Sequence, residues 1–316
     1  MDKEMSKDRD ERDASPDWES LPTEARHPGS FDLDRLPIEE VVALILEEDR
    51  RGLDAALRHR KAIAQAANRL AETLTDGGSI LLAGAGTSGR LGVIEAAECP
   101  PTFGSDPARI RAVIAGGREA VFVALEGAED REDEGRRAAS GLGPEDLLIG
   151  LSASSVTPYT RGALLAARGR GARTILLTCA GPAGLSGLAG LVIALDTGAE
   201  VLTGSTRLKA GSATKAVLNA ITTAAMVRLG KVFENWMVDL RPGSAKLRDR
   251  SVRIVAEAGG VPGRRAEELL AEAEGEVKTA LLMARRGIGA GDARSRLAAA
   301  AGSVRRALEE AAPLEK

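Results

Sequence analysis

Residues 81–92 read LLAGAGTSGRLG, an apolar run that stops at a glycine-rich turn. Glycines at 84, 86 and 89 fit the pattern G-x-G-x-x-G, which binds dinucleotides where a strand passes into a helix. That interpretation also requires an Asp or Glu at the end of the second strand to hold the ribose. The second predicted strand instead ends in the Gly-Gly pair at 116–117. The turn therefore favours a phosphate group outside a dinucleotide.

Short β-rich runs alternate with helical stretches around this turn. They are SILLA (79–83), IRAVIA (110–115), LLIGLSA (147–153), TILLT (174–178) and LVIAL (191–195). Such alternation predicts an α/β fold in which a parallel sheet is covered by helices on both faces, as three layers. Ligands of such sheets bind beyond the carboxyl ends of the strands. The turns GAGTSGR, GGREA and SASSVTP all fall at those ends.

The regions outside the sheet have different compositions. Residues 1–20 mix charges of both signs with almost nothing to bury, which predicts a solvated, disordered tail. Residues 21–76 carry apolar side chains at helical spacing, which predicts two or three amphipathic helices. We expect the sheet domain over residues 77–240. Residues 241–316 predict a small helical, UBA-like domain whose helices are separated by glycines and which supplies a packing or oligomerisation surface.

Composition excludes several classes of protein. Of the 316 residues 44% are hydrophobic, and the net charge is −3 from 43 basic and 46 acidic residues, so we expect no nucleic-acid or membrane partner. No run approaches about 18 apolar residues. Two cysteines are too few for a disulfide framework and favour a cytoplasmic protein. With only His27 and His59, a Ser-His-Asp triad or a multi-histidine metal site is hard to build, so acid–base chemistry falls to carboxylates or lysines.

Two of the turns are rich in hydroxyl groups. Thr87 and Ser88 lie in the first, and SASSVTP supplies Ser152, Ser154 and Thr157. A phosphate monoester binds backbone N–H groups at a helix N-terminus together with short hydroxyl donors. Two such turns at neighbouring strand ends indicate a sugar phosphate. The alternative is that these residues only cap helices.

Three longer stretches carry a resemblance to a known family. GAGTSGRLGVIEAAECPPTFG, AGGREAVFVALEGAED and GAEVLTGSTRLKAGSATK resemble the N-acetylmuramic acid 6-phosphate etherases, and the resemblance runs from residue 21 nearly to the C-terminus. It implies a sugar isomerase (SIS) fold and a homodimer whose active sites are shaped by both subunits. It also implies cleavage of the D-lactyl ether of N-acetylmuramic acid 6-phosphate, giving N-acetylglucosamine 6-phosphate and D-lactate.

The resemblance also implies roles for two glutamates. Glu98 in ECPP matches the family's acid, which protonates the departing lactate, and Glu129 in GAED matches the base at C2. From spacing alone, each would be a solvated surface residue. In the opened sugar the C2 proton lies next to an aldehyde, so elimination followed by hydration needs one base and one acid. No metal and no cofactor is implied, because these groups and the aldehyde suffice.

Further substrate or phosphate contacts are predicted in the same turns. Lys209 follows another glycine- and hydroxyl-containing turn, GSTRLKAG, and is expected to balance substrate charge or reach the dimer-related site; the alternative is a surface lysine at a helix start. The complete predicted set is Gly86, Thr87, Ser88, Gly89, Ser152, Ser154, Thr157, Glu200, Ser205 and Lys209.

One turn departs from the family pattern. The family has S-A-S-G-R-T-P where this chain has SASSVTP, so Ser155 stands for glycine and Val156 for arginine. Loss of glycine restricts the turn if its φ is positive, and loss of arginine removes an anion partner.

Two other functions remain open from the sequence. One is a non-catalytic sugar-phosphate sensor of the same fold, similar to the glucokinase regulatory protein. The other is a phosphosugar isomerase, which also needs a carboxylate base but no acid for a lactyl group.

Overall fold

The structure is a computed structural model that describes residues 21–181, 185, 187–240 and 243–309. The predicted tail, residues 1–20, lies outside the described residues. Five parallel strands form the central sheet in the order β2-β1-β3-β4-β5. They are β1 (Ile80–Gly84), β2 (Ile110–Ile114), β3 (Leu147–Leu151), β4 (Arg173–Thr178) and β5 (Leu191–Ala194). All five predicted strands are confirmed, with ends that differ by a residue or two.

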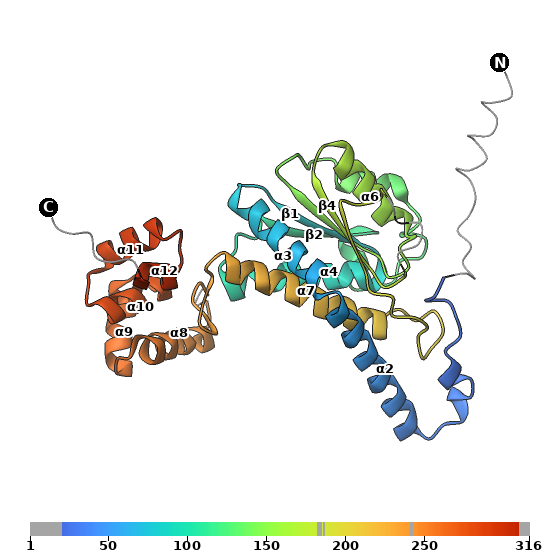
Figure 1. The fold of residues 1–316 in the computed structure, drawn as a ribbon, viewed down its shortest axis with the longest axis horizontal. Coiled ribbons are helices and arrows are strands. Elements are labelled where there is room, and N and C mark those ends of the chain that lie inside the picture. The colour runs from blue at the N-terminus through green and yellow to red at the C-terminus, as the bar shows by residue number, and fades with distance from the viewer. Residues whose placement is uncertain (1–20, 182–184, 186, 241–242, 310–316) are drawn as a thin grey trace, which may run out of the picture.

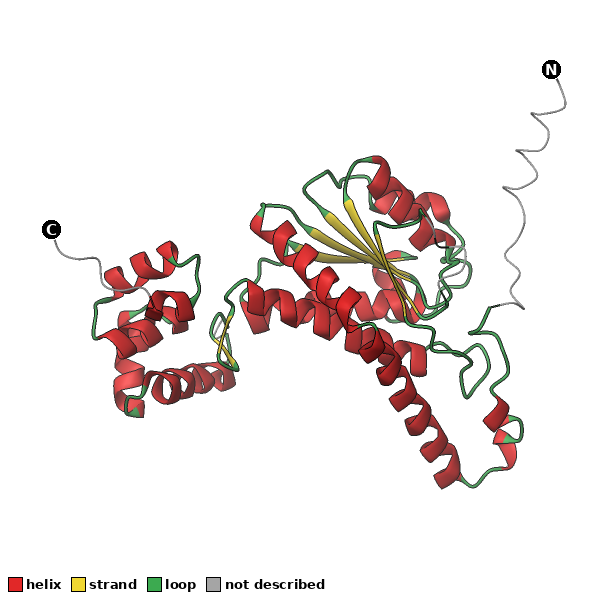
Figure 2. Cartoon of the chain, viewed as in Figure 1, coloured by secondary structure: helices red, strands yellow, loops and turns green. Residues whose placement is uncertain are grey.

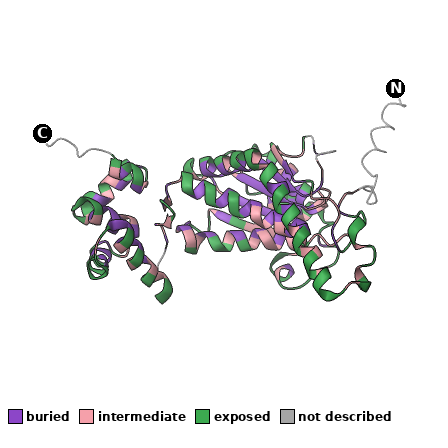
Figure 3. Cartoon of the chain, turned by 60° about the horizontal axis from the view of Figure 1, so that its bottom comes forward, coloured by how far each residue is buried: buried purple, intermediate pink, exposed green. Residues whose placement is uncertain are grey.

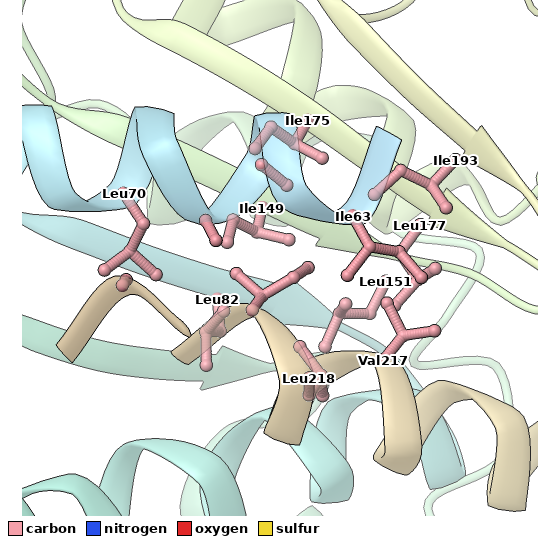
Figure 4. Close-up of a cluster of buried hydrophobic side chains, with 14 of the residues drawn as sticks. Ile63, Leu70, Leu82, Ile149, Leu151, Ile175, Leu177, Ile193, Val217 and Leu218 are labelled. Atoms are coloured by element: carbon pink, nitrogen blue, oxygen red, sulfur yellow. The ribbon is translucent and has the colours of Figure 1, made fainter. Parts of the chain in front are cut away.

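Helices cover both faces of the sheet (Figures 1 and 2). On one face lie α3 (Arg60–Thr75), α4 (Gly86–Phe103) and α7 (Lys209–Arg228), and on the other α5 (Glu132–Ala138) and α6 (Pro158–Gly169). Side chains of β1 alternate between the two cores: Leu82 packs with α3 and α7 (Figure 4), whereas Leu81 packs with α6. Burial on both faces explains why β1 and β3 are apolar throughout. The predicted three-layer α/β architecture is confirmed.

Among the described residues two α-helices precede the first strand, within the predicted two or three, and the first of them leaves large apolar side chains exposed. Helix α2 (Ile38–Arg58) follows the short 3₁₀ turns η2 (Pro28–Ser30) and η3 (Leu33–Arg35) and projects from the body (Figure 1). It packs on α7 through small residues, since a Cβ at Gly52 would lie 2.9 Å from Lys209 Cγ. Five of its large apolar side chains are 46–79% exposed, namely Ile38, Val42, Leu46, Leu53 and Leu57.

The C-terminal helices form a core of their own. A short hairpin, β6 (Val232–Phe233) and β7 (Trp236–Met237), precedes α8 (Ala245–Gly259), α9 (Gly263–Glu272), α10 (Val277–Arg286), α11 (Ala290–Ala299) and α12 (Val304–Glu309). Phe233 joins the apolar cluster of these helices, which is separate from the two clusters of the sheet. The helices themselves lie apart from the sheet (Figures 1 and 3). No described helix is both long and apolar enough to cross a membrane.

Candidate active site

The glycine-rich turn joins β1 directly to α4. Gly86, the first residue of α4, has a φ of +52°, which a side chain would disfavour. A Cβ at Gly89 would lie 2.6 Å from Ile114 Cγ1 and 2.7 Å from the carbonyl oxygen of Gly84, so glycine is required for α4 to approach the sheet this closely. The N-terminus of α4 therefore sits at the carboxyl edge of the sheet, where its N–H groups favour an anion.

A pocket of about 210 Å³ lies at this edge. It is lined by Glu24, Ala85, Gly86, Thr87, Ser88, Glu129, Ala153, Ser154, Thr157 and Thr206. A second cavity of about 140 Å³ shares Gly86 and Glu129 with it. The fold thus brings the two hydroxyl-rich turns and one of the predicted glutamates into one pocket, which can hold a small anionic ligand against hydroxyl donors and a carboxylate.

The turn after β3 is held by its own hydroxyl groups. Ser152 is buried, and its Oγ lies 2.8 Å from Thr157 Oγ1, so Ser152 supports the turn while Ser154 and Thr157 line the pocket. Ser155 has a φ of +67°, and its Oγ donates to the carbonyl oxygen of Ser154 at 2.5 Å. This position therefore needs the left-handed conformation that glycine adopts at little cost.

Backbone contacts fix the loop that carries Glu129. The Glu129 carbonyl accepts the N–H of Tyr159 at 2.9 Å, which ties the loop to the start of α6. Arg90 of α4 donates through Nε to the carbonyl of Val121 at 3.0 Å and through Nη2 to that of Val123 at 3.2 Å. The Glu129 side chain is exposed and lines both cavities, so it is open to a ligand.

Glu98 does not line the pocket. It lies eleven residues after Thr87 on α4, which corresponds to about 16 Å along the helix axis, and its side chain is exposed. One turn earlier, Glu95 is buried and accepts Lys215 Nζ at 2.7 Å and Thr222 Oγ1 at 2.5 Å. Within one chain, therefore, Glu98 and Glu129 do not share a pocket.

Lys209 and Glu200 do not line this pocket of the single chain, and their contacts with the substrate or the dimer-related site stay predictions. Lys209 is buried, and its Nζ donates to Glu48 Oε2 at 2.6 Å and to the Ala199 carbonyl at 2.7 Å, so the surface-lysine alternative is wrong. Glu200 accepts the N–H groups of Lys209 at 3.1 Å and Ala210 at 2.9 Å and so caps α7. Burial raises the pKa of Glu200 despite these hydrogen bonds. Ser205 lies in the same loop without lining the pocket.

Two lining residues, Glu24 and Thr206, were missed by sequence reasoning. Glu24 precedes α2 in the chain, and no local pattern connects it with a turn after β1. Thr206 follows the predicted Ser205, so the sequence located the hydroxyl-containing turn but not this lining residue. The only available signal for Glu24 was that it lies within the stretch that resembles the family.

Neither cysteine is suited to catalysis, and a metal site is not evident. Cys99 and Cys179 are buried and free. Burial raises the pKa of Cys99 to about 12 and that of Cys179 to about 11, which disfavours a thiolate. Within the described ranges no group of three or more His, Cys, Asp or Glu side chains is arranged to hold a metal ion.

The chain is similar to known proteins in sequence and in fold. The family model for the glucokinase regulatory protein N-terminal SIS domain matches residues 62–168. The N-acetylmuramic acid 6-phosphate etherase of Rubrobacter xylanophilus is 49% identical over 92% of this chain and 96% of its own length. That of Cutibacterium acnes is 47% identical over 91% and 95%. Among solved structures, the Vibrio vulnificus NanR protein complexed with ManNAc-6P has a TM-score of 0.41 at 17% identity, and the match covers 69% of each chain. On the identity and coverage of the sequence relatives, the chain belongs to the N-acetylmuramic acid 6-phosphate etherase family.

Proposed function

We propose that this protein cleaves the D-lactyl ether of N-acetylmuramic acid 6-phosphate with water, giving N-acetylglucosamine 6-phosphate and D-lactate in the recycling of cell-wall amino sugars. The observation that carries the proposal is the pocket in which Glu129 faces two hydroxyl-rich turns at the N-terminus of α4. The names of relatives up to 49% identical supply the reaction. We also propose that it acts in the cytoplasm, without a metal or a cofactor.

The phosphate is expected at the α4 end of the pocket. Thr87 and Ser88 supply hydroxyl donors next to the free N–H groups of the first helical turn, and Ser154 and Thr157 face them from the turn after β3. Hydrogen bonds to an ionised phosphate are stronger than those between neutral groups. The dipole of α4 adds a further favourable contribution. This anchor leaves the sugar carbons to extend toward Glu129.

Elimination followed by hydration fits a site of this kind. Glu129 removes the C2 proton of the opened sugar, since the aldehyde stabilises the resulting enolate. The C3–O bond to lactate then breaks as an acid protonates the leaving oxygen. Addition of water to the unsaturated aldehyde reverses the proton transfers and returns a hydroxyl at C3.

The acid is proposed to be Glu98 of a second subunit. In one chain Glu98 is exposed and remote from the pocket, so it is available to a neighbouring molecule. The exposed apolar stripe of α2 supports a homodimer, because five large side chains along one projecting helix would otherwise face water. A symmetric dimer presents the same surface twice and can complete two sites at once.

The deciding experiment is release of D-lactate from N-acetylmuramic acid 6-phosphate by the purified protein. Turnover with deuterium entering C2 in heavy water is the expected result, because the base exchanges its proton with solvent. A protein that is stabilised by sugar 6-phosphates but releases no lactate is a sensor. This second candidate is favoured by the match to the glucokinase regulatory protein domain. Conversion of the sugar between aldose and ketose forms without lactate release would instead identify an isomerase.

A further inference from the structure

We infer that Glu24 contacts the substrate and accepts hydrogen bonds from the O–H or N–H groups of the sugar, so that residues 21–30 complete the pocket as a substrate-recognition segment. The inference rests on the proposed function for the identity of the sugar. It is independent of which glutamate acts as acid.

Glu24 reaches the pocket beside the loop that precedes α7. Its carboxylate lies against Gly204, where a Cβ would come within 2.9 Å of Glu24 Oε2. Gly204 has a φ of +74°, so both its conformation and the space beside it suit glycine. Thr206 of the same loop lines the pocket together with Glu24. Glu24 is exposed in the chain, so its oxygens are open to a ligand.

Buried neighbours hold this segment in place. Thr23 and His27 are both less than a tenth exposed, on either side of the exposed Glu24. His27 Nδ1 accepts the N–H of Gly29 at 3.1 Å, so the ring carries its proton on Nε2, which lies 3.2 Å from Glu48 Oε1. His27 therefore fastens the segment to α2 only three residues after Glu24.

The anchor itself is a buried ionic cluster. Glu48 is 2% exposed and receives Lys209 Nζ at 2.6 Å and Arg51 Nη1 at 2.6 Å. Burial opposes its ionisation, but the hydrogen bond from Lys209 and the nearby positive charges leave the pKa of Glu48 below its usual value. Glu48 therefore stays ionised at neutral pH and connects the segment of Glu24 to α7, the helix that follows the Gly204 loop.

The chemistry of the carboxylate defines what it binds. An ionised carboxylate only accepts hydrogen bonds and repels phosphate, so Glu24 has no use at the anionic end of the ligand. Hydroxyl side chains of the pocket both donate and accept, and Glu129 is assigned to the C2 proton. Glu24 is thus the lining group suited to sugar O–H and acetamido N–H donors. It distinguishes a phosphosugar from inorganic phosphate.

Calorimetric titration with N-acetylglucosamine 6-phosphate and with inorganic phosphate tests this role. Glu24→Ala is expected to raise the Kd of the sugar phosphate about 10- to 100-fold, because hydrogen bonds to a charged group are lost. Glu24→Gln keeps one acceptor oxygen, so it should raise the Kd of the sugar phosphate by a smaller factor. The Kd of inorganic phosphate should stay the same or fall, since a negative charge is removed. Asp34→Asn, an exposed change in the neighbouring stretch before α2, is the matched control and should alter neither.

Three outcomes would overturn the inference. An equal rise in the Kd of the sugar phosphate and of inorganic phosphate would mean that Glu24 only supports the fold of the pocket. Unchanged Kd values would mean that Glu24 makes no contact with the ligand. Failure of the wild type to bind the sugar phosphate would mean that the pocket is not a phosphosugar site. Failure of the proposed function is distinguishable, because a wild type that binds the sugar phosphate, depends on Glu24 and releases no lactate sinks only the etherase proposal. Thermal melts of each variant establish that folding is unchanged.

Discussion

The two ends of helix α4 differ in what they contribute to the site. Its N-terminal end places Gly86, Thr87 and Ser88 in the pocket, whereas its C-terminal end carries Glu98 on an exposed surface. Glu98 lies about 16 Å along the helix axis from Thr87 and does not line the pocket. Within one chain only the N-terminal end of α4 lines the pocket, and under the proposed mechanism Glu98 would act on the pocket of a second subunit.

The largest effect is expected from the base that faces the N-terminal end of α4. Glu129→Gln should lower lactate release by about 10²- to 10⁴-fold or more and abolish exchange of the C2 proton, because no enolate forms. Both are followed in heavy water, lactate by enzymatic assay and exchange by NMR. Asp130→Asn, next to it and outside the pocket, serves as the control. Lactate release near the wild-type rate by folded Glu129→Gln protein would refute the mechanism.

The next prediction tests whether the far end of α4 acts on a partner. Glu98→Gln should block ether cleavage by a similar factor while some C2 exchange continues, since the base remains. Dimers re-formed from equal amounts of Glu98→Gln and Glu129→Gln chains should regain about one quarter of wild-type activity, because half the dimers then hold one intact site of two. No recovery on mixing would mean that both glutamates act within one chain or that Glu98 is not the acid.

Much of the fold was predictable because its signals are local. Each strand is an apolar run bounded by turn residues, and burial on both faces of a parallel sheet leaves little ambiguity. Thr87, Ser88, Ser154 and Thr157 were also predictable, since strand order places both turns at one edge. Such inferences need only the neighbouring residues and the rule for parallel sheets.

The contacts that sequence reasoning missed join residues that are distant in the chain. Lys209 in a hydroxyl-rich turn looks like an anion ligand until Glu48, 161 residues earlier, is placed beside its ammonium group. Leu53 and Leu57 lie at helical spacing, which predicts a buried face. In the structure α2 instead packs on α7 through its small residues and leaves both leucines exposed. Glu24 lines the pocket, and the His27 that follows three residues later lies 3.2 Å from Glu48 of α2. None of these contacts produces a periodic pattern or a motif in the sequence from which it could be predicted.

The third prediction concerns the surface that would bring Glu98 of one subunit to the pocket of another. Leu46→Glu, on the exposed stripe of α2, should convert dimers to monomers, because a charge placed in an apolar interface loses its hydration without gaining a partner. Light scattering measures the mass, and lactate release should fall with the dimer fraction. Glu47→Gln, an exposed neighbour on the same helix, is the control. A fully active monomer would contradict the shared site.

A smaller effect is expected from the phosphate-binding end of α4. Ser88→Ala removes a donor to a charged group, worth about 1.5–3 kcal/mol, so the Kd of a sugar 6-phosphate should rise roughly 10- to 150-fold. The Kd of inorganic phosphate should rise as well, whereas the Glu24 variants are expected to leave it unchanged or lower it. NAD should stabilise neither protein in a thermal shift assay. Stabilisation by NAD as large as that by the sugar phosphate would revive the dinucleotide interpretation of the glycine-rich turn.

The smallest effect is predicted at the turn that faces this end from β3. Ser155 is held at a φ of +67°, a conformation that costs an L-residue about 1–2 kcal/mol, and its hydroxyl returns part of this through the hydrogen bond to Ser154. Ser155→Gly should therefore raise the free energy of unfolding by about 0.5–1 kcal/mol, since relief of strain slightly exceeds the greater entropy of an unfolded glycine. Ser155→Ala keeps the strain and loses the hydrogen bond, so it should destabilise the protein. Urea denaturation of the three proteins gives the order. Both variants lack the hydroxyl, so a Gly variant less stable than the Ala variant would mean that relief of backbone strain is smaller than the added entropy of the unfolded glycine.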